Sequence, residues 1–160
     1  MELVKCGLYV TGIALEGKEE AVGAGQLVYF HNHSRQGPPI VLLPEQNTHN
    51  RWSFADQGFL VEGAGADAFM GRLEARPKQG FYVATAKIDV PGGEIPPRLL
   101  LQLGYNRRGE VILFPAQVHG NGVQFPEKGF RFGETGVLAS LRPADFMVQR
   151  TVEPSDRTLH

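Results

Sequence analysis

Apolar residues in this chain come in short runs that glycine, proline and polar residues separate. Their shortness and their bounding residues favour strands over helices. The runs span residues 7–15, 26–30, 40–43, 59–61, 81–90, 99–103, 111–114 and 130–132. Because twenty glycines and eleven prolines interrupt the chain, this pattern indicates a mainly β protein.

Two stretches have helical spacing instead. The apolar residues of 66–74 fall on one helical face, and so do those of the shorter stretch 136–141. We therefore expect two short helices, each lying between apolar runs.

The order of these elements repeats along the chain. Gly7-Leu8-Tyr9-Val10 returns as Gly80-Phe81-Tyr82-Val83, and later motifs return at a separation of 71 to 73 residues. Between residues 44–61 and 115–132, six of eighteen positions are identical, whereas unrelated stretches share roughly one. The identical residues in the first stretch are Pro44, Gln46, Asn50, Phe54, Gly58 and Phe59. We interpret this pattern as an internal duplication.

The duplication predicts one domain over residues 1–150, built from two β-rich repeats at about 7–77 and 80–145. Asp145-Phe146-Met147-Val148 resembles the start of both repeats and predicts a closing strand near 145–150. The polar residues 151–160 form a flexible tail in this interpretation. We expect a pseudo-two-fold β-barrel or β-sandwich with one short helix per repeat. Four phenylalanines at matching positions should be largely buried, namely Phe54, Phe59, Phe125 and Phe130.

Composition narrows the classes of partner. Sixteen basic and seventeen acidic residues give a net charge of −1 without long runs of like charge, which argues against nucleic acid and anionic membranes as partners. The N-terminus lacks an apolar signal region and no run is long enough to span a membrane, so we expect a cytoplasmic protein. Cys6 alternates with Val4 and Leu8, which predicts a small buried hydrophobe.

Residues that differ between the repeats are freer to serve function than those kept in both. The loop around Trp52, the only tryptophan, places His49 and Arg51 beside an aromatic ring, a combination enriched at binding surfaces. A core anchor is the alternative role for Trp52. Arg107 and Arg108 lie at a predicted hairpin tip, either as solvated charges or as anion ligands. These five residues are the candidate binding site.

A metal site is the alternative. His31 and His33 stand two apart on a predicted strand, so both imidazoles share one face and can ligate one metal ion. Gly25, five residues and then this His-x-His pair resemble the first half of the cupin metal motif, and Gly109 to His119 resembles the second half. The resemblance implies a β-barrel metalloenzyme with His31, His33 and His119 as ligands. However, the glutamate that follows the pair in cupins is absent, and the repeat alignment equates His31 with the apolar Leu103.

No phosphate loop, dinucleotide fingerprint, nucleophile elbow or paired-cysteine zinc motif occurs, and no motif implies a cofactor. The sequence therefore favours a non-catalytic binding or protein-interaction module, whose partner is an unidentified protein or small ligand and which can form oligomers. A small, distantly cupin-like metal-dependent enzyme is the alternative function.

Overall fold

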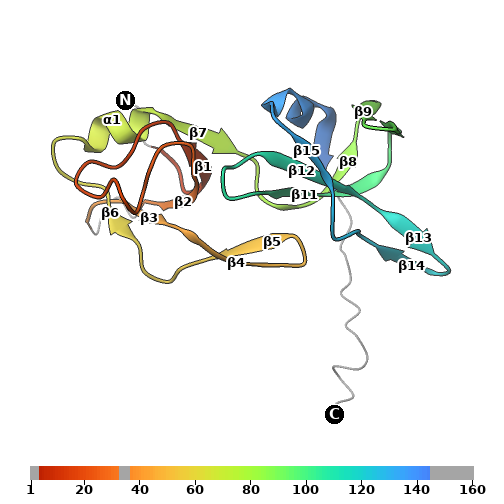
Figure 1. Ribbon diagram of the computed structural model, residues 1–160, viewed down its shortest axis with the longest axis horizontal. Helices are drawn as coiled ribbons and strands as arrows, with labels where there is room; N and C mark the ends of the chain where they lie inside the picture. The colour runs from red at the N-terminus through yellow and green to blue at the C-terminus, as the bar shows by residue number, and fades with distance from the viewer. Residues whose placement is uncertain (1–3, 33–36, 145–160) are drawn as a thin grey trace, which may run out of the picture.

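The computed structural model describes residues 4–32 and 37–144, and within these ranges no helix is long and apolar enough to cross a membrane. Each half of the chain forms one five-stranded antiparallel sheet, and the two sheets lie next to each other along the long axis (Figure 1). The predicted mainly β class is confirmed. None of the sheets closes into a barrel in the described part of the chain, so that predicted architecture is not formed.

The first sheet has the order β6-β3-β2-β1-β7, and the second has the order β15-β12-β11-β8-β16. The strands of the first are β1 (Gly7–Thr11), β2 (Leu27–His31), β3 (Ile40–Leu42), β6 (Phe59–Leu60) and β7 (Leu73–Arg76). Those of the second are β8 (Gly80–Ala84), β11 (Leu100–Tyr105), β12 (Val111–Pro115), β15 (Phe130–Phe132) and β16 (Leu141–Pro143). When the five strands of each sheet are numbered along the chain, both sheets have the order 4-3-2-1-5.

Smaller elements occupy matching places between these strands. The hairpin of β4 (Pro44–Thr48) and β5 (Arg51–Phe54) follows β3, and that of β13 (Gln117–His119) and β14 (Gly122–Gln124) follows β12. Helix α1 (Ala66–Gly71) precedes β7, and the 3₁₀ helix η1 (Thr135–Ser140) precedes β16, as the sequence predicts. A third hairpin, of β9 (Ile88–Val90) and β10 (Gly93–Ile95), occurs in the second half.

All eight apolar runs contain strands. The polar hairpins were not predicted, because they contain no apolar run. The short strands after the two helices were not predicted either: residues 73–74 had been assigned to the helix over 66–74, which ends at Gly71, and residue 141 to the helix over 136–141. The predicted closing strand at 145–150 and the tail at 151–160 lie outside the described residues.

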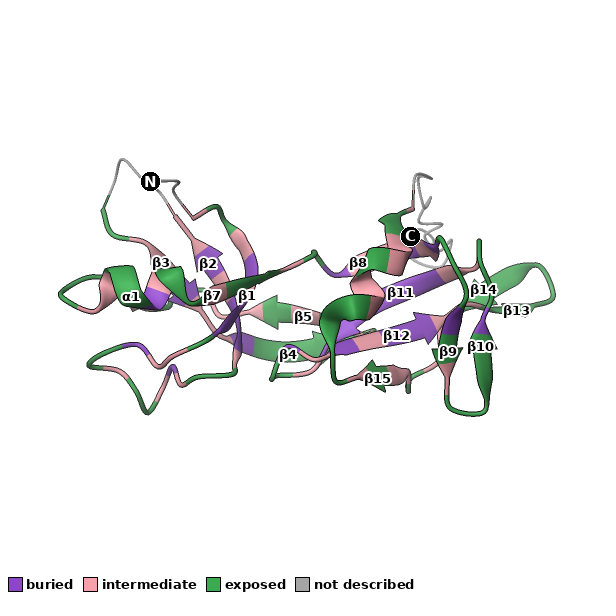
Figure 2. Cartoon of the chain, turned by 90° about the horizontal axis from the view of Figure 1, so that it is seen from above, coloured by how far each residue is buried: buried purple, intermediate pink, exposed green. Residues whose placement is uncertain are grey.

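Each half has its own apolar core, visible as separate groups of buried strand residues in Figure 2. The core of the first half gathers around Phe30 and Phe69, with α1 packed over it. The core of the second half gathers around Leu103 and Tyr105, and it also takes in Leu8 and Leu27 from the first sheet. The two halves therefore share apolar contacts as well as a covalent linker.

The expectation that Cys6 is buried is wrong. Cys6 is exposed; its Sγ accepts a hydrogen bond from the Asn32 backbone N–H at 3.2 Å and lies 3.7 Å from His31 Nδ1. The four matching phenylalanines, predicted to be largely buried, are all of intermediate exposure. They lie in or beside the hairpins and the edge strands, where only one side of a ring meets the core.

Gly58 and Gly129 fill matching positions just before the edge strands β6 and β15. A Cβ on Gly58 would collide with the Val41 carbonyl oxygen, and one on Gly129 would lie 2.5 Å from that of Leu113. The edge strand can approach its neighbour in each sheet only because these residues lack a side chain.

We predict that Gly129→Ala destabilises the protein by about 1–3 kcal/mol, because a methyl group must displace the β12 backbone. The matched control is Gly133→Ala, where an added Cβ meets no atom within 4 Å, and its effect should stay below about 0.5 kcal/mol. Urea denaturation measures both. Equal losses in the two variants would contradict the packing explanation.

Candidate functional site at the junction of the halves

The β4–β5 hairpin extends from the first half across to the second (Figure 1). Thr48 pairs with Arg51, which leaves His49 and Asn50 as a two-residue turn. Both turn residues are left-handed, with φ of 53° and 66°. Left-handed conformation at both positions defines a type I′ turn, whose twist matches that of the strands and keeps the hairpin regular to its tip.

The tip of the hairpin is held against β11. Asn50 Nδ2 donates to Gln102 Oε1 at 3.1 Å and to the Pro126 carbonyl at 3.2 Å, while Gln102 Nε2 donates to the His49 carbonyl at 2.9 Å. Gly104 makes this approach possible, since a Cβ there would lie 2.9 Å from the Asn50 carbonyl oxygen. The buried amide of Gln102 thus has a partner for both its oxygen and its nitrogen.

Trp52 fixes the middle of the hairpin. Its backbone N–H donates to Gln79 Oε1 at 2.7 Å, and Gln79 Nε2 donates back to its carbonyl at 3.1 Å. The indole Nε1 donates to the Tyr105 carbonyl at 2.7 Å. The guanidinium of Arg107 lies 4.8 Å from the centre of the indole ring and donates to the Pro44 carbonyl at 3.1 Å. We call these contacts, with those of Asn50, the hairpin joint.

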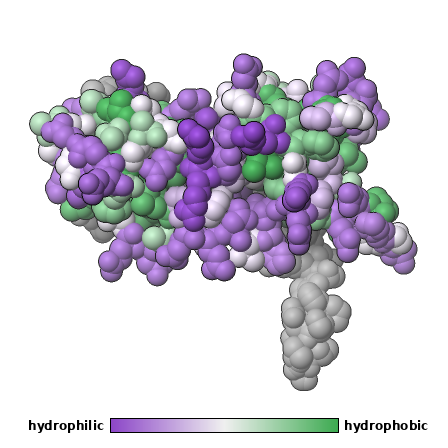
Figure 3. All heavy atoms as spheres, viewed as in Figure 1, coloured by the Kyte–Doolittle hydropathy of each residue, from purple (hydrophilic) through white to green (hydrophobic). Residues whose placement is uncertain are grey.

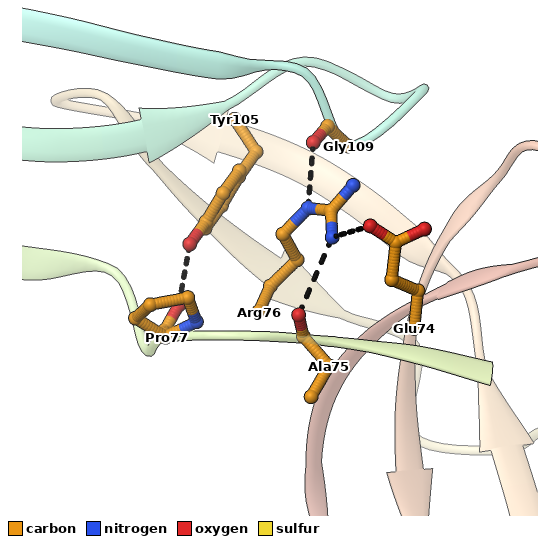
Figure 4. A network of polar contacts seen from close by, with 6 residues as sticks. All are labelled: Glu74, Ala75, Arg76, Pro77, Tyr105 and Gly109. Atoms are coloured by element: carbon orange, nitrogen blue, oxygen red, sulfur yellow. Dashed lines mark hydrogen bonds and ion pairs between the residues drawn. The ribbon is translucent and has the colours of Figure 1, made fainter. Parts of the chain in front are cut away.

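A second group of contacts surrounds the linker between the sheets (Figure 4). The Tyr105 hydroxyl donates to the Pro77 carbonyl at 2.6 Å. Arg76 Nε donates to the Gly109 carbonyl at 3.1 Å, and its guanidinium pairs with Glu74 at 2.9 Å. Burial of the Tyr105 hydroxyl is the main cause that raises its pKa above the ordinary value. The chain between the two sheets is therefore hydrogen-bonded to the second half at both Arg76 and Pro77.

A cleft of about 420 Å³ opens beside the hairpin tip. Its apolar wall is the ring pair of Phe81 and Phe125, whose centroids are 5.3 Å apart. Its other lining residues come from the first hairpin, from β11 and from the chain after β14, namely Asn47, His49, Asn50, Gln102, Pro126 and Glu127. The cleft thus combines an aromatic surface with amide, imidazole and carboxylate groups from both halves.

A smaller cleft of about 230 Å³ shares Phe81 with the first. Arg51 and Lys78 line it, both exposed, and its wall continues to Pro143 and Ala144. Phe81 is the residue that lines both clefts, and we call the two clefts together the junction cleft. Figure 3 shows hydrophilic residues over the β4–β5 part of the molecule.

The predicted binding residues are only partly brought together. His49 and Arg51 line the junction cleft, whereas Trp52 and Arg107 contact each other inside the hairpin joint. Arg108 is exposed in the turn between β11 and β12, where its backbone N–H donates to Asn106 Oδ1. That Trp52 or Arg108 also contacts an external partner stays a prediction.

Sequence reasoning missed Phe81, Phe125 and Gln102. The two phenylalanines follow the pattern of core residues, so nothing distinguished them. Gln102 did carry a signal, since it interrupts the apolar run Leu99 to Leu103 and a polar group inside a buried strand needs a specific partner.

The alternative metal ligands are separated in the fold. His31 lies in β2 of the first sheet, and His119 lies in β13 at the opposite end of the long axis in both views (Figures 1 and 2); His33 is outside the described residues. Among the described residues, no group of three or more His, Cys, Asp or Glu side chains is placed to hold a metal ion.

The register also corrects the repeat alignment at this histidine. Gly7 pairs with Phe30, whereas its counterpart Gly80 pairs with Leu103. Phe30 is therefore the counterpart of Leu103, and His31 is the counterpart of Gly104. His31 thus occupies the face that carries the hairpin tip in the second half, not a core face.

We predict that Trp52→Ala lowers the free energy of unfolding by about 3 kcal/mol, because it removes a partly buried, packed ring and its hydrogen-bonded indole donor. Trp52→Phe keeps most of the ring and should cost about 1 kcal/mol for the lost hydrogen bond. The control is Val123→Ala at the matching, exposed position of the second hairpin, with a change within about 0.5 kcal/mol. An unchanged stability of Trp52→Ala would assign the ring to an external partner instead.

We predict that stability falls steeply above a pH of about 10. Tyrosine in the unfolded chain ionises near that pH, whereas Tyr105 and Tyr82 keep their protons to higher pH in the fold because burial raises each pKa. Unfolding therefore releases protons, and the stabilisation present below pH 10 is lost as the pH rises. Urea titrations from pH 7 to 11 measure the slope, which Tyr105→Phe should flatten. An unchanged slope in that variant would contradict the assignment.

Comparisons of the chain with protein-family models, with curated proteins and with solved structures find no match. The functional argument therefore depends on the geometry of the junction cleft.

Proposed function

We propose that this chain is a non-catalytic binding module and that the junction cleft binds an extended peptide. The observation that carries the proposal is the convergence of both halves on one preformed cleft with a paired aromatic wall. Ligand sites occur preferentially between structural units and combine apolar walls with a few polar groups. The volume of about 420 Å³ suits a few residues of peptide.

The shape of the cleft favours a peptide over a compact ligand. The main cleft and the smaller one share Phe81 as a lining residue, so a ligand that occupies both is elongated. An apolar side chain would pack on Phe81 and Phe125, while peptide amides would meet the exposed side chains of Asn47 and His49.

The charged residues of the junction cleft favour one orientation of a bound peptide. Arg51 and Lys78 line the smaller end of the junction cleft, and Glu127 lines the larger end. A peptide with an acidic residue at the Arg51 end and an apolar residue beside it complements this arrangement. The hairpin joint holds the walls in place before binding, which lowers the entropic cost of association.

A cleft contained within the second half is a weaker candidate. It has a volume of about 410 Å³ and runs from Asp89 to Val137. Its cation Arg131 already pairs with Glu110 at 3.1 Å, and the first half contributes nothing to it. The residues that distinguish the two halves, His49, Arg51 and Trp52, lie instead at the junction.

We also infer that the two halves arose by duplication of one unit. The shared strand order, the matching glycines before β6 and β15, and the six identical residues in eighteen support this origin. After duplication, one hairpin was free to become the joint while the unit kept its fold. A cytoplasmic location, and the exclusion of nucleic acid and membranes as partners, stay predictions from composition.

We predict that the protein enriches peptides with an acidic and an adjacent apolar residue from a displayed library of random heptapeptides. Arg51→Glu should weaken the selected peptides about thirtyfold, or 2 kcal/mol, in fluorescence anisotropy titrations. Arg72→Glu, a charge reversal at an exposed arginine outside the cleft, is the control and should leave affinity unchanged. Failure to enrich any sequence, or equal losses in both variants, would contradict the proposal.

A further inference from the structure

Asn121 is the asparagine of this chain that precedes a glycine. The five asparagines are Asn32, Asn47, Asn50, Asn106 and Asn121, and the residue after Asn121 is Gly122. When the main-chain nitrogen of the following residue reaches the side-chain carbonyl carbon of an asparagine, a five-membered succinimide ring can close. A following glycine obstructs this approach least, because it has no Cβ and its backbone rotates most freely. Whether the ring closes in the folded protein then depends on how each side chain is held.

The other four asparagines are constrained by the fold. Three side-chain nitrogens donate hydrogen bonds: that of Asn32 to the Val4 carbonyl at 3.1 Å, that of Asn50 to Gln102 Oε1 at 3.1 Å and that of Asn106 to Glu110 Oε1 at 2.8 Å. Asn47 lies in the paired strand β4, and the residue after it is the β-branched Thr48. The ring closure is therefore opposed by a hydrogen bond or by a bulky neighbour at each of these positions.

Asn121 has neither constraint. It is exposed, and its side chain makes no hydrogen bond within residues 4–32 and 37–144. His119 pairs with Gly122, so Gly120 and Asn121 form the two-residue turn of the β13–β14 hairpin. Gly120 is left-handed, with a φ of 60°, whereas Asn121 is not, which defines a type II′ turn. The amide of Asn121 is thus open to water at the tip of a hairpin.

The hairpin around Asn121 can also open locally. The Gly122 main-chain nitrogen must leave its place in the hairpin before it can attack the side chain. All six residues of β13 and β14 are exposed, and a two-stranded hairpin without buried residues opens at little cost in free energy. The matching turn of the first hairpin differs, because the two hydrogen bonds that Asn50 donates hold it on the second half.

We propose that Asn121 is a site of spontaneous deamidation, with water as the co-reactant. The Gly122 main-chain nitrogen attacks the side-chain carbonyl carbon of Asn121, and the new C–N bond closes the succinimide ring. The side-chain nitrogen leaves as ammonia and takes the proton that the Gly122 nitrogen gives up. Water then adds to one of the two ring carbonyl carbons and breaks the bond from that carbon to the ring nitrogen. Opening at the side-chain carbon gives aspartate, and opening at the main-chain carbon gives isoaspartate.

Both products change the hairpin. Each replaces a neutral amide with a carboxylate, so the tip gains a negative charge. In isoaspartate the main chain runs through the side-chain carbons and is one carbon longer, so the two-residue turn no longer places His119 opposite Gly122. Asn121 does not line the junction cleft, and this inference and the proposed function can therefore fail independently.

Incubation of the full-length protein in mildly alkaline buffer tests the proposal, with aspartate and isoaspartate quantified at each asparagine by peptide mapping and mass spectrometry. Conversion at Asn121 should exceed that at every other asparagine by about tenfold or more. Gly122→Ala should slow it about tenfold, because a methyl group obstructs the ring closure. The fold tolerates this variant, since the added Cβ meets only the His119 carbonyl oxygen, at 3.7 Å, and Gly122 is not left-handed. An Asn121 that stays intact in the folded protein while it converts in urea would overturn the proposal.

A second variant separates the effect of the fold from that of the sequence. Arg51→Gly places the same Asn-Gly pair in the first hairpin, and Trp52 fluorescence verifies that the variant is folded. Asn50 of this variant should stay intact in the folded protein, because its amide is held by Gln102 and Pro126. In urea it should convert as fast as Asn121. Equal conversion of the two asparagines in the folded variant would contradict the structural explanation.

Discussion

The architecture depends on one long-range contact, the docking of the β4–β5 hairpin on the second sheet. Without it, the halves would be joined by the linker at Pro77, by apolar contacts around Leu8 and Leu27, and by hydrogen bonds to Gly109 from Arg76 and to Arg107 from Leu27. The hairpin adds three sets of hydrogen bonds. The indole of Trp52 donates to Tyr105, the Trp52 backbone forms two hydrogen bonds with Gln79, and the side-chain amide of Asn50 donates to Gln102. Each such bond contributes about 1 kcal/mol net, and together they fix one relative placement of the halves.

This joint also builds the cleft. The hairpin tip brings His49 and Asn47 next to Phe125, and the following strand brings Arg51 next to Lys78. The β4–β5 hairpin is polar and extends from one apolar core to the other, so polar groups stay exposed along both of its edges. The docking of the hairpin thus both holds the two halves together and forms the junction cleft.

Apolar runs were enough to predict four strands of each five-stranded sheet, because each run has one face against a core. They could not predict β4, whose residues Pro44 to Thr48 are almost all polar, since that strand is stabilised by contacts with residues far along the chain. The short strands β7 and β16 were not predicted, because their first residues had been assigned to the helices over 66–74 and 136–141, whereas backbone pairing to β1 and β8 makes them strands.

Within the candidate site, the asymmetry between the repeats identified His49, Arg51 and Trp52, but not their different roles. The ring of Trp52 faces inward because Tyr105 offers a backbone acceptor 53 residues away, which no local pattern reveals. A one-residue error in aligning His31 arose because His31 was matched with Leu103, whereas the strand pairing of Gly7 with Phe30 and of Gly80 with Leu103 makes Phe30 the matching residue. Strand register, which alternates faces at every residue, made that small error decisive.

The hairpin joint has a consequence for folding during synthesis on the ribosome. Asn50 donates to the carbonyl of Pro126, a residue added 76 positions later. At a translation rate of about 5–20 residues per second, the finished hairpin waits roughly 4–15 seconds for its acceptor. During the first part of that interval, until Tyr105 is added 53 residues after it, the indole ring of Trp52 also lacks its hydrogen-bond acceptor. During synthesis there is thus an interval in which the first unit has been fully translated but still exposes apolar surface, to which chaperones would bind.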